Sequence, residues 1–170
     1  MKKIILLLLA SLVLTSCGYR PSSKFSRDVL GEKISTSVII SQVDPENTVL
    51  IKDAVDGAIV ETLQASLTSR SRSDSHLKFS ISTPSYTAIQ YDENGYVIAY
   101  RMQITLNITR FKEGRQKNYT AHGTYDFSVT PNAVVTDQER FDAIKFSAAK
   151  AIDSFIAQLA SEGARKNKKD

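Results

Sequence analysis

An alternation of apolar and polar side chains constrains this chain more than any other feature. Every second residue from Tyr96 to Ile108 is apolar or aromatic, and the positions between them from Ala99 to Thr109 are small or polar. A period of two is typical of a β-strand that has one side in a hydrophobic core and the other in a polar medium. The stretch therefore predicts a long strand in a sheet whose open face is rich in Thr, Asn, Gln and Ser.

Turn signals flank this strand on both sides. Asn94-Gly95 stands at the centre of residues 92–95, a typical hairpin turn, and residues 112–115 turn the chain again. A partner strand is expected over residues 118–129. The side chains expected to face inward are Tyr119, Ala121, Gly123, Tyr125, Phe127 and Val129, and those expected to face outward are Asn118, Thr120, His122, Thr124 and Asp126.

A strand and a helix are expected before the hairpin. Residues 33–43 are rich in β-branched side chains and predict a first strand, and the turn at 44–47 contains Pro45. Residues 49–69 carry an apolar side chain at every fourth position, which predicts a helix capped by Asn47 or Thr48. The polar side of this helix is net acidic, which favours a core helix over a helix on a membrane surface.

Another strand and a second helix complete the set of expected elements. Residues 76–83 alternate and predict a strand; Pro84 interrupts it, and residues 86–91 continue as an irregular or bulged extension. Residues 136–139 (TDQE) fit a capping box. This box predicts a helix to about Glu162, which Gly163 is expected to end.

The order of elements defines the expected fold class. It is β-α-β-β-β-α, or β-α-β-β-α if the stretch after Pro84 belongs to the second strand. The economical arrangement is an α+β two-layer sandwich, with a mixed four-stranded sheet and both helices on one face. The helix at 49–69 makes a crossover, so the strands that flank it should be parallel and the hairpin strands antiparallel.

The N-terminus resembles the signal of a bacterial lipoprotein. Lys2 and Lys3 precede an apolar run over residues 4–14, which is too short to span a bilayer. Thr15 and Ser16 stand before Cys17, the only cysteine, as in a lipobox. The resemblance implies cleavage before Cys17, acylation of its sulfur and of the new amino terminus, and, with Gly18 following, delivery to the outer membrane.

The expected organisation follows from that cleavage. Residues 1–16 are the signal peptide, 17–32 the lipidated terminus and tether, 33–163 one α+β domain and 164–170 a disordered basic tail. The formal charge of +4 falls to +2 without Lys2 and Lys3. This is too mild for a nucleic-acid-binding protein, which typically needs a concentrated basic face.

Catalytic patterns are absent from the sequence. There is no HExxH, Walker, GxGxxG or GxSxG motif, and the two histidines, His76 and His122, lack a metal-ligand spacing. We therefore expect no enzyme, no metal and no cofactor. The topology brings five basic residues of the loops to the end of the sheet where the mature N-terminus starts. These residues, candidates for contact with phosphate groups, are Arg70, Arg72, Lys112, Arg115 and Lys117. Charged, solvated loops are the alternative interpretation.

The chain resembles the LptE family of lipopolysaccharide-assembly lipoproteins. The resemblance rests on Cys17-Gly18-Tyr19-Arg20 after the signal, on residues 99–109 (AYRMQITLNIT) and on the order of elements, including the Asn94-Gly95 turn and the Pro131-Asn132 linker. It implies a plug inside the β-barrel LptD that helps the barrel fold and contacts lipopolysaccharide. A polar open sheet face suits the polar lumen of such a barrel.

One departure from the family pattern concerns lipopolysaccharide. Well-known members carry basic contact residues in the hairpin loop and before the last helix, but the matching positions here are Glu93 and Thr136. Arg101 and the basic residues at the opposite end are the substitutes. Two other classes remain open: another outer-membrane assembly lipoprotein or pilotin, and a stand-alone periplasmic lipoprotein that binds a glycan or a small ligand.

Overall fold

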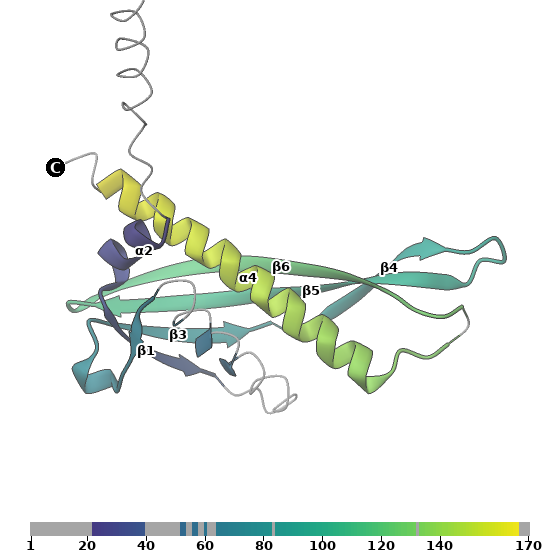
Figure 1. Cartoon of the computed structure of the whole chain (residues 1–170), viewed down its shortest axis with the longest axis horizontal. Coiled ribbons are helices and arrows are strands. Elements are labelled where there is room, and N and C mark those ends of the chain that lie inside the picture. The colour runs from purple at the N-terminus through teal and green to yellow at the C-terminus, as the bar shows by residue number, and fades with distance from the viewer. Residues whose placement is uncertain are drawn as a thin grey trace, which may run out of the picture.

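The computed structural model describes residues 22–39, 52–53, 56–57, 60, 64–82, 84–131 and 133–166. These residues form an α+β fold with one curled, mixed sheet (Figure 1). The helices are α2 (Ser22–Leu30) and α4 (Asp137–Lys166), with a 3-10 turn η1 (Arg70–Arg72). The strands are β1 (Lys33–Val38), β2 (Ser66–Leu67), β3 (Ser75–Ile81), β4 (Ser85–Tyr91), β5 (Val97–Lys112) and β6 (Arg115–Ser128). The α+β class is confirmed, but the expected four-stranded sheet is wrong, because the sheet has six strands.

Strand β5 is the centre of the sheet. Strand β6 pairs with it in antiparallel register along its whole length, from Ala99 opposite Ser128 to Lys112 opposite Arg115. Strands β3 and β4 also pair with β5, at residues 106–111 and 97–103. Since a strand has two edges, β3 and β4 follow one another along the edge opposite β6. Pro84, which cannot donate a ladder hydrogen bond, lies between them and divides what would otherwise be one long strand.

The first strand lies in parallel register with both of its neighbours. Ile34 of β1 stands opposite Ser75 of β3 and opposite Leu67 of β2. The expected parallel pair across a crossover is therefore confirmed. Strand β1 ends at Val38, and the turn expected at 44–47 lies outside the described residues.

The helix expected at 49–69 lies mostly outside the described residues. Residues 52, 53, 56, 57 and 60 are helical, and Asp56 forms an ion pair with Lys52 and accepts a hydrogen bond from Thr36 of β1 at 2.6 Å. The expected end at Ser69 is wrong, because residues 66–67 form β2 beside β1. The expected cap at Asn47 or Thr48 is not among the described residues.

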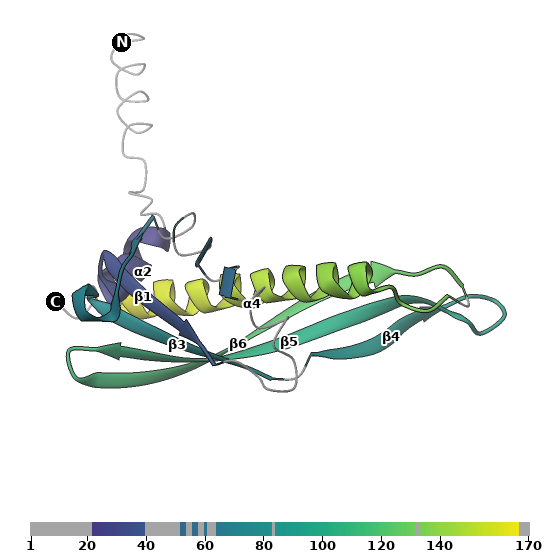
Figure 2. The ribbon, with the colours of Figure 1, turned by 90° about the horizontal axis from the view of Figure 1, so that it is seen from below.

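Helix α2 lies within residues 17–32, where the sequence predicts a tether. Its Ser26, Val29 and Leu30 are buried, and the Ser26 hydroxyl donates to the carbonyl oxygen of Ile156 in α4 at 3.3 Å. Gly31 ends the helix with φ of 93°, and its amide donates to Arg27 O at 2.7 Å. Seen from the side, α2 and α4 lie on the same side of the sheet (Figure 2).

Helix α4 begins at the expected capping box. The Glu139 amide donates to Thr136 Oγ1 at 3.2 Å, and the Thr136 amide donates to Glu139 Oε2 at 2.8 Å. The expected end of the helix at Gly163 is wrong, because α4 continues to Lys166 and takes in the first residues of the expected tail. A Cβ atom at Gly163 would lie 2.1 Å from Phe25 O, so this glycine permits α2 to contact α4.

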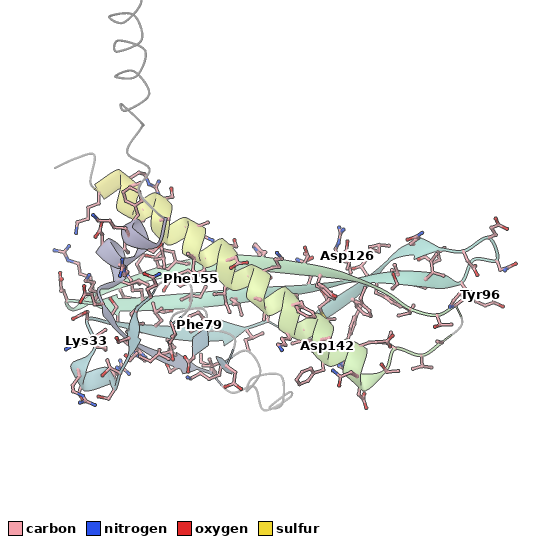
Figure 3. The ribbon with its side chains drawn as sticks, in the orientation of Figure 1. Lys33, Phe79, Tyr96, Asp126, Asp142 and Phe155 are labelled. Atoms are coloured by element: carbon pink, nitrogen blue, oxygen red, sulfur yellow. The ribbon has the colours of Figure 1, made fainter. Side chains whose placement is uncertain are left out.

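The core lies between α4 and the covered face of the sheet. Phe155 of α4 packs edge-on against Phe79 and Tyr119, with ring centroids 6.1 and 5.3 Å away (Figure 3). A Cβ atom at Gly123 of β6 would lie 1.9 Å from Ser147 O, so α4 approaches the sheet backbone directly at this point. The even-numbered residues from Met102 to Ile108 are all buried, as the alternation predicts.

Candidate functional site

The face of the sheet opposite α4 is polar. Along β5 and β6 the side chains of Arg101, Gln103, Asn107, Asn118, Thr120, His122, Thr124 and Asp126 are exposed. They pair across the two strands: Arg101 stands opposite Asp126, Gln103 opposite Thr124 and Asn107 opposite Thr120. The expected open polar face is therefore confirmed for these strands.

Hydrogen bonds link several of these cross-strand pairs. Arg101 Nε and Nη2 each donate to a carboxylate oxygen of Asp126 at 2.7 Å. These hydrogen bonds lower the pKa of Asp126 and raise that of Arg101. Thr105 Oγ1 and His122 Nδ1 share a hydrogen bond of 2.9 Å. The face thus offers an ordered polar surface, and Arg101 has an anionic partner within the chain.

The other histidine, His76, is buried at the start of β3. His76 Nδ1 lies 2.9 Å from Ser35 Oγ, and Nε2 lies 3.1 Å from Ser37 Oγ. Burial lowers the pKa of His76, and the nearby Arg70 and Lys78 lower it further. Ser35 and His76 are 3% and 7% exposed. Ser37 is half-buried, so the three side chains form a hydrogen-bonded cluster between β1 and β3 that lies mostly inside the fold.

Basic residues line a pocket on the helix-covered side, beside the turn between β5 and β6. The cavity measures about 140 Å³, and its cationic side chains are Arg110, Lys112, Arg115, Lys117 and Lys166. Val29 of α2, Glu113, Gln116 and Glu162 complete the lining. Lys112 Nζ donates to Val29 O at 3.0 Å, which joins the pocket to α2.

Glu162 organises the inner wall of this pocket. Its carboxylate accepts hydrogen bonds from Lys117 Nζ and Tyr119 Oη, each at 2.7 Å, and from Arg110 Nη2 at 3.1 Å. Burial alone would raise the pKa of Glu162, but these donors outweigh it and lower the pKa. The glutamate is therefore ionised and compensates part of the positive charge.

The structure divides the expected basic cluster into two groups. Lys112, Arg115 and Lys117 come together in the pocket as expected. Arg70 instead lies 5.7 Å from the ring centroid of Phe111, and Phe111 alternates with Arg110 and Lys112, so Arg70 lies on the other face of the sheet. Arg72 Nε donates to Ser69 Oγ at 3.2 Å in η1.

Two basic residues of the pocket, Arg110 and Lys166, are not among the expected site residues. Arg110 continues the even-numbered series of inward positions, and this register alone places it on the covered face. Lys166 is in α4, although the sequence analysis placed it in a tail. Glu93 lies in the turn between β4 and β5, and Thr136 serves as the cap of α4, so neither supplies a cation.

Exposed apolar side chains gather at the end of the molecule far from the pocket. Strand β4 exposes Ile89 and Tyr91, and Tyr96 follows the turn. Figure 3 shows Tyr96 and Lys33 at opposite ends of the long axis. Val134, which precedes α4, and Phe141, in the second turn of this helix, are also exposed. An apolar patch of this kind typically marks a contact with another molecule.

Two other kinds of feature are absent from the part of the chain that the structure describes. Within the described ranges, no three His, Cys, Asp or Glu residues are grouped as they would be around a metal ion. No helix among the described residues has the length and the apolar character needed to cross a membrane.

These features define a small α+β domain with one helix-covered face and one open polar face, and similar folds occur in solved structures. Rare lipoprotein B from Shewanella oneidensis superposes with a TM-score of 0.53 at 14% identity, covering 79% of this chain and 98% of that one. A putative lipoprotein from Caulobacter crescentus gives a TM-score of 0.52 at 10% identity, with coverages of 84% and 96%. A minor lipoprotein from Acinetobacter baumannii gives 0.52 at 7% identity, with coverages of 79% and 94%. At identities this low, the superpositions show a common fold and carry no further conclusion.

The family is defined by the sequence itself. The family model LptE, described as Lipopolysaccharide-assembly, matches residues 35–159. The chain therefore belongs to the LptE family, and the resemblance inferred from the sequence is confirmed. No curated protein matches the chain.

Proposed function

We propose that this chain is an outer-membrane lipoprotein that plugs an LptD-like β-barrel and assists its assembly for lipopolysaccharide transport. Cys17 is the proposed attachment point for the lipid, and the protein acts as a binding partner without enzymatic activity. Membership of a lipopolysaccharide-assembly family supports the process. The observation that carries the plug role is the ordered polar face of β5 and β6.

The two faces of the sheet differ in the kind of partner that each can contact. The covered face is occupied by α4, whereas the open face exposes hydroxyl, amide and charged side chains in register. A barrel lumen in the outer membrane is lined by polar side chains. The hydrogen-bonding groups on the open face can form hydrogen bonds with such a polar wall. An apolar partner surface would bury these groups without hydrogen bonds.

The exposed patch at the far end supports a second contact with the same partner. Ile89, Tyr91 and Tyr96 are 41%, 58% and 47% exposed on a narrow hairpin that projects past α4 (Figure 1). Aromatic side chains of this kind are enriched at protein interfaces. Lipopolysaccharide contact is part of the proposal, with the basic residues Arg70, Arg72, Arg101, Lys112, Arg115 and Lys117 as candidates.

The experiment is co-purification from detergent-solubilised outer membranes, with the stoichiometric partner identified by mass spectrometry. We expect an LptD-like barrel. The double variant Gln103→Trp, Thr124→Trp places two bulky rings on the open face and should reduce barrel recovery at least about tenfold, while circular dichroism remains native. The matched control Lys145→Trp, Lys150→Trp alters exposed positions on α4 and should retain the barrel.

Other results would assign the chain differently. A secretin or another assembly barrel as the partner would favour a pilotin, and a monomer without any barrel would favour a stand-alone binding lipoprotein. Depletion of the chain should also lower the levels of surface lipopolysaccharide and of the LptD-like barrel. Unchanged levels of both would overturn the proposal. A mature chain whose mass includes no acyl groups at Cys17 would overturn the anchor.

A further inference from the structure

We propose that the pocket between the β5–β6 turn, α2 and the end of α4 binds a phosphoryl group. The ligand class is a phosphate monoester or diester, carried by a lipid headgroup, by a phosphorylated glycolipid or by free phosphate. The proposal deepens the lipopolysaccharide contact proposed above. It does not depend on the barrel, and its test is independent of barrel recovery.

The charge of the lining is the first argument. Five cationic side chains face two anionic ones, Glu113 and Glu162, so three positive charges are in excess. Glu162 is already engaged with Arg110, Lys117 and Tyr119. Arg115 and Lys166 make no ion pair or hydrogen bond through their side chains with the described residues. Like charges held together repel one another, and a bound oxyanion removes that repulsion.

Arg110 supplies the second argument. Its side chain is 14% exposed, Nη2 donates to Glu162, and the guanidinium carbon lies 5.7 Å from the centre of the Tyr119 ring. Its Nη1 atom is buried and has no acceptor among the described residues. A buried guanidinium nitrogen without an acceptor costs free energy, so it is seldom left in this state. A phosphoryl oxygen beside Arg110 would provide the acceptor after a small movement of the side chain.

The size and the place of the cavity are the third argument. A volume of about 140 Å³ far exceeds the roughly 10–15 Å³ that one water molecule needs, so a tetrahedral phosphoryl group fits. Lys112 joins the pocket to Val29 of α2, and α2 begins at Ser22, five residues after Cys17. Five extended residues span at most about 18 Å. With Cys17 acylated, the pocket lies at the end of the domain nearest to the headgroups of its own membrane.

The test uses the lipidated chain in micelles of an uncharged detergent and isothermal titration calorimetry. Three probes distinguish the sources of the group: inorganic phosphate, dihexanoyl phosphatidylglycerol and a diphosphorylated lipid A disaccharide. We expect saturable binding of at least one probe, and the one bound most tightly identifies the source. The double variant Arg115→Ser, Lys166→Ser should weaken this binding at least about tenfold, because charge-assisted hydrogen bonds are the stronger ones.

Two further variants keep the result interpretable. Lys145→Ser, Lys150→Ser removes the same charge from exposed positions of α4 outside the pocket and should retain the affinity. Arg110→Gln should lose binding even if the protein keeps its native circular dichroism. The proposal is overturned if no probe binds, or if the α4 control loses as much affinity as the pocket variant. If the wild-type chain binds a probe but no barrel co-purifies with it, the plug function alone is overturned.

Discussion

The hydroxyl group of Tyr119 donates a hydrogen bond of 2.7 Å to the carboxylate of Glu162. Tyr119 lies in the first half of β6 and Glu162 in the last turns of α4, so this bond fixes the end of the helix to the sheet. Burial raises the pKa of Tyr119, and the hydrogen bond to the ionised Glu162 raises it further. The phenol is therefore always a donor in the neutral range of pH.

Replacement of Glu162 by Gln should destabilise the protein by about 1–3 kcal/mol at neutral pH, since a half-buried carboxylate loses its charge-assisted hydrogen bonds. Urea denaturation measures the free energy of unfolding. The folded pKa of Glu162 lies below its ordinary value of 4.5. Its contribution is therefore present above pH 4.5 and is lost as the pH falls through the folded pKa.

The difference between wild type and Glu162→Gln should accordingly shrink under acid conditions. Glu113→Gln makes the same change of charge in the exposed turn and should leave the free energy of unfolding almost unaltered at neutral pH. If the difference in free energy of unfolding between the wild type and Glu162→Gln stays constant down to pH 3, the role assigned to this carboxylate is contradicted.

His76 should make the stability of the protein depend on pH around neutrality. Burial, together with Arg70 and Lys78, lowers its folded pKa below 6.5, so the unfolded chain binds a proton more readily than the folded chain. The contribution is present above pH 6.5 and is lost as the pH falls through the folded pKa. Melting temperatures measured between pH 5 and 8 should fall on acidification.

The variant His76→Asn should flatten this dependence, because its side chain cannot take up the proton. His122→Asn changes the other histidine, which is exposed on the open face, and should retain the wild-type slope. If the melting temperatures of the wild type and His76→Asn depend equally on pH, protonation of the buried ring does not contribute to the pH dependence of stability.

Two glycines should be irreplaceable because backbone occupies the space next to them. An added Cβ would lie 1.9 Å from Ser147 O at Gly123 and 2.1 Å from Phe25 O at Gly163. We expect each Ala variant to lose about 2 kcal/mol or more in thermal or urea denaturation, as for other overpacked sites. Proteolysis near α2 should rise in Gly163→Ala.

Gly57 provides the matched control for these substitutions. It is helical, and an added Cβ would meet nothing within 4 Å. Gly57→Ala should therefore be neutral or stabilising by up to about 1 kcal/mol, through the helix propensity of alanine. Destabilisation of all three variants to the same degree would count against close backbone contact as the cause.

The parts of the fold that were predictable from the sequence are those with a repeated local signal. The alternation from Met102 to Ile108 persists in the burial of the sheet, and the Thr136–Glu139 box caps α4. Helix α2 has only nine residues, too few to establish a period, and its stability comes from packing on α4. Gly163 looked like a helix terminator because the sequence does not reveal a neighbouring helix that requires a small residue.

The candidate site was predictable in part for the same reason. The alternation predicted the polar face of β5 and β6, and the loops predicted the gathering of Lys112, Arg115 and Lys117. The position of Arg70 on the opposite face depends on how η1 folds over Phe111, which is a tertiary effect. The exposed side chains at the far end depend on where α4 starts relative to the sheet.

The length of β5 has a mechanical consequence. Its 16 residues run without interruption, and at about 3.3 Å per residue they span roughly 50 Å, more than the thickness of a lipid bilayer with its headgroups. Because β6 pairs with it from Ala99 to Lys112 without a register shift, one continuous two-stranded ladder joins the two ends of the sheet. A plug built on this strand, as proposed above, would reach from one rim of a barrel to the other.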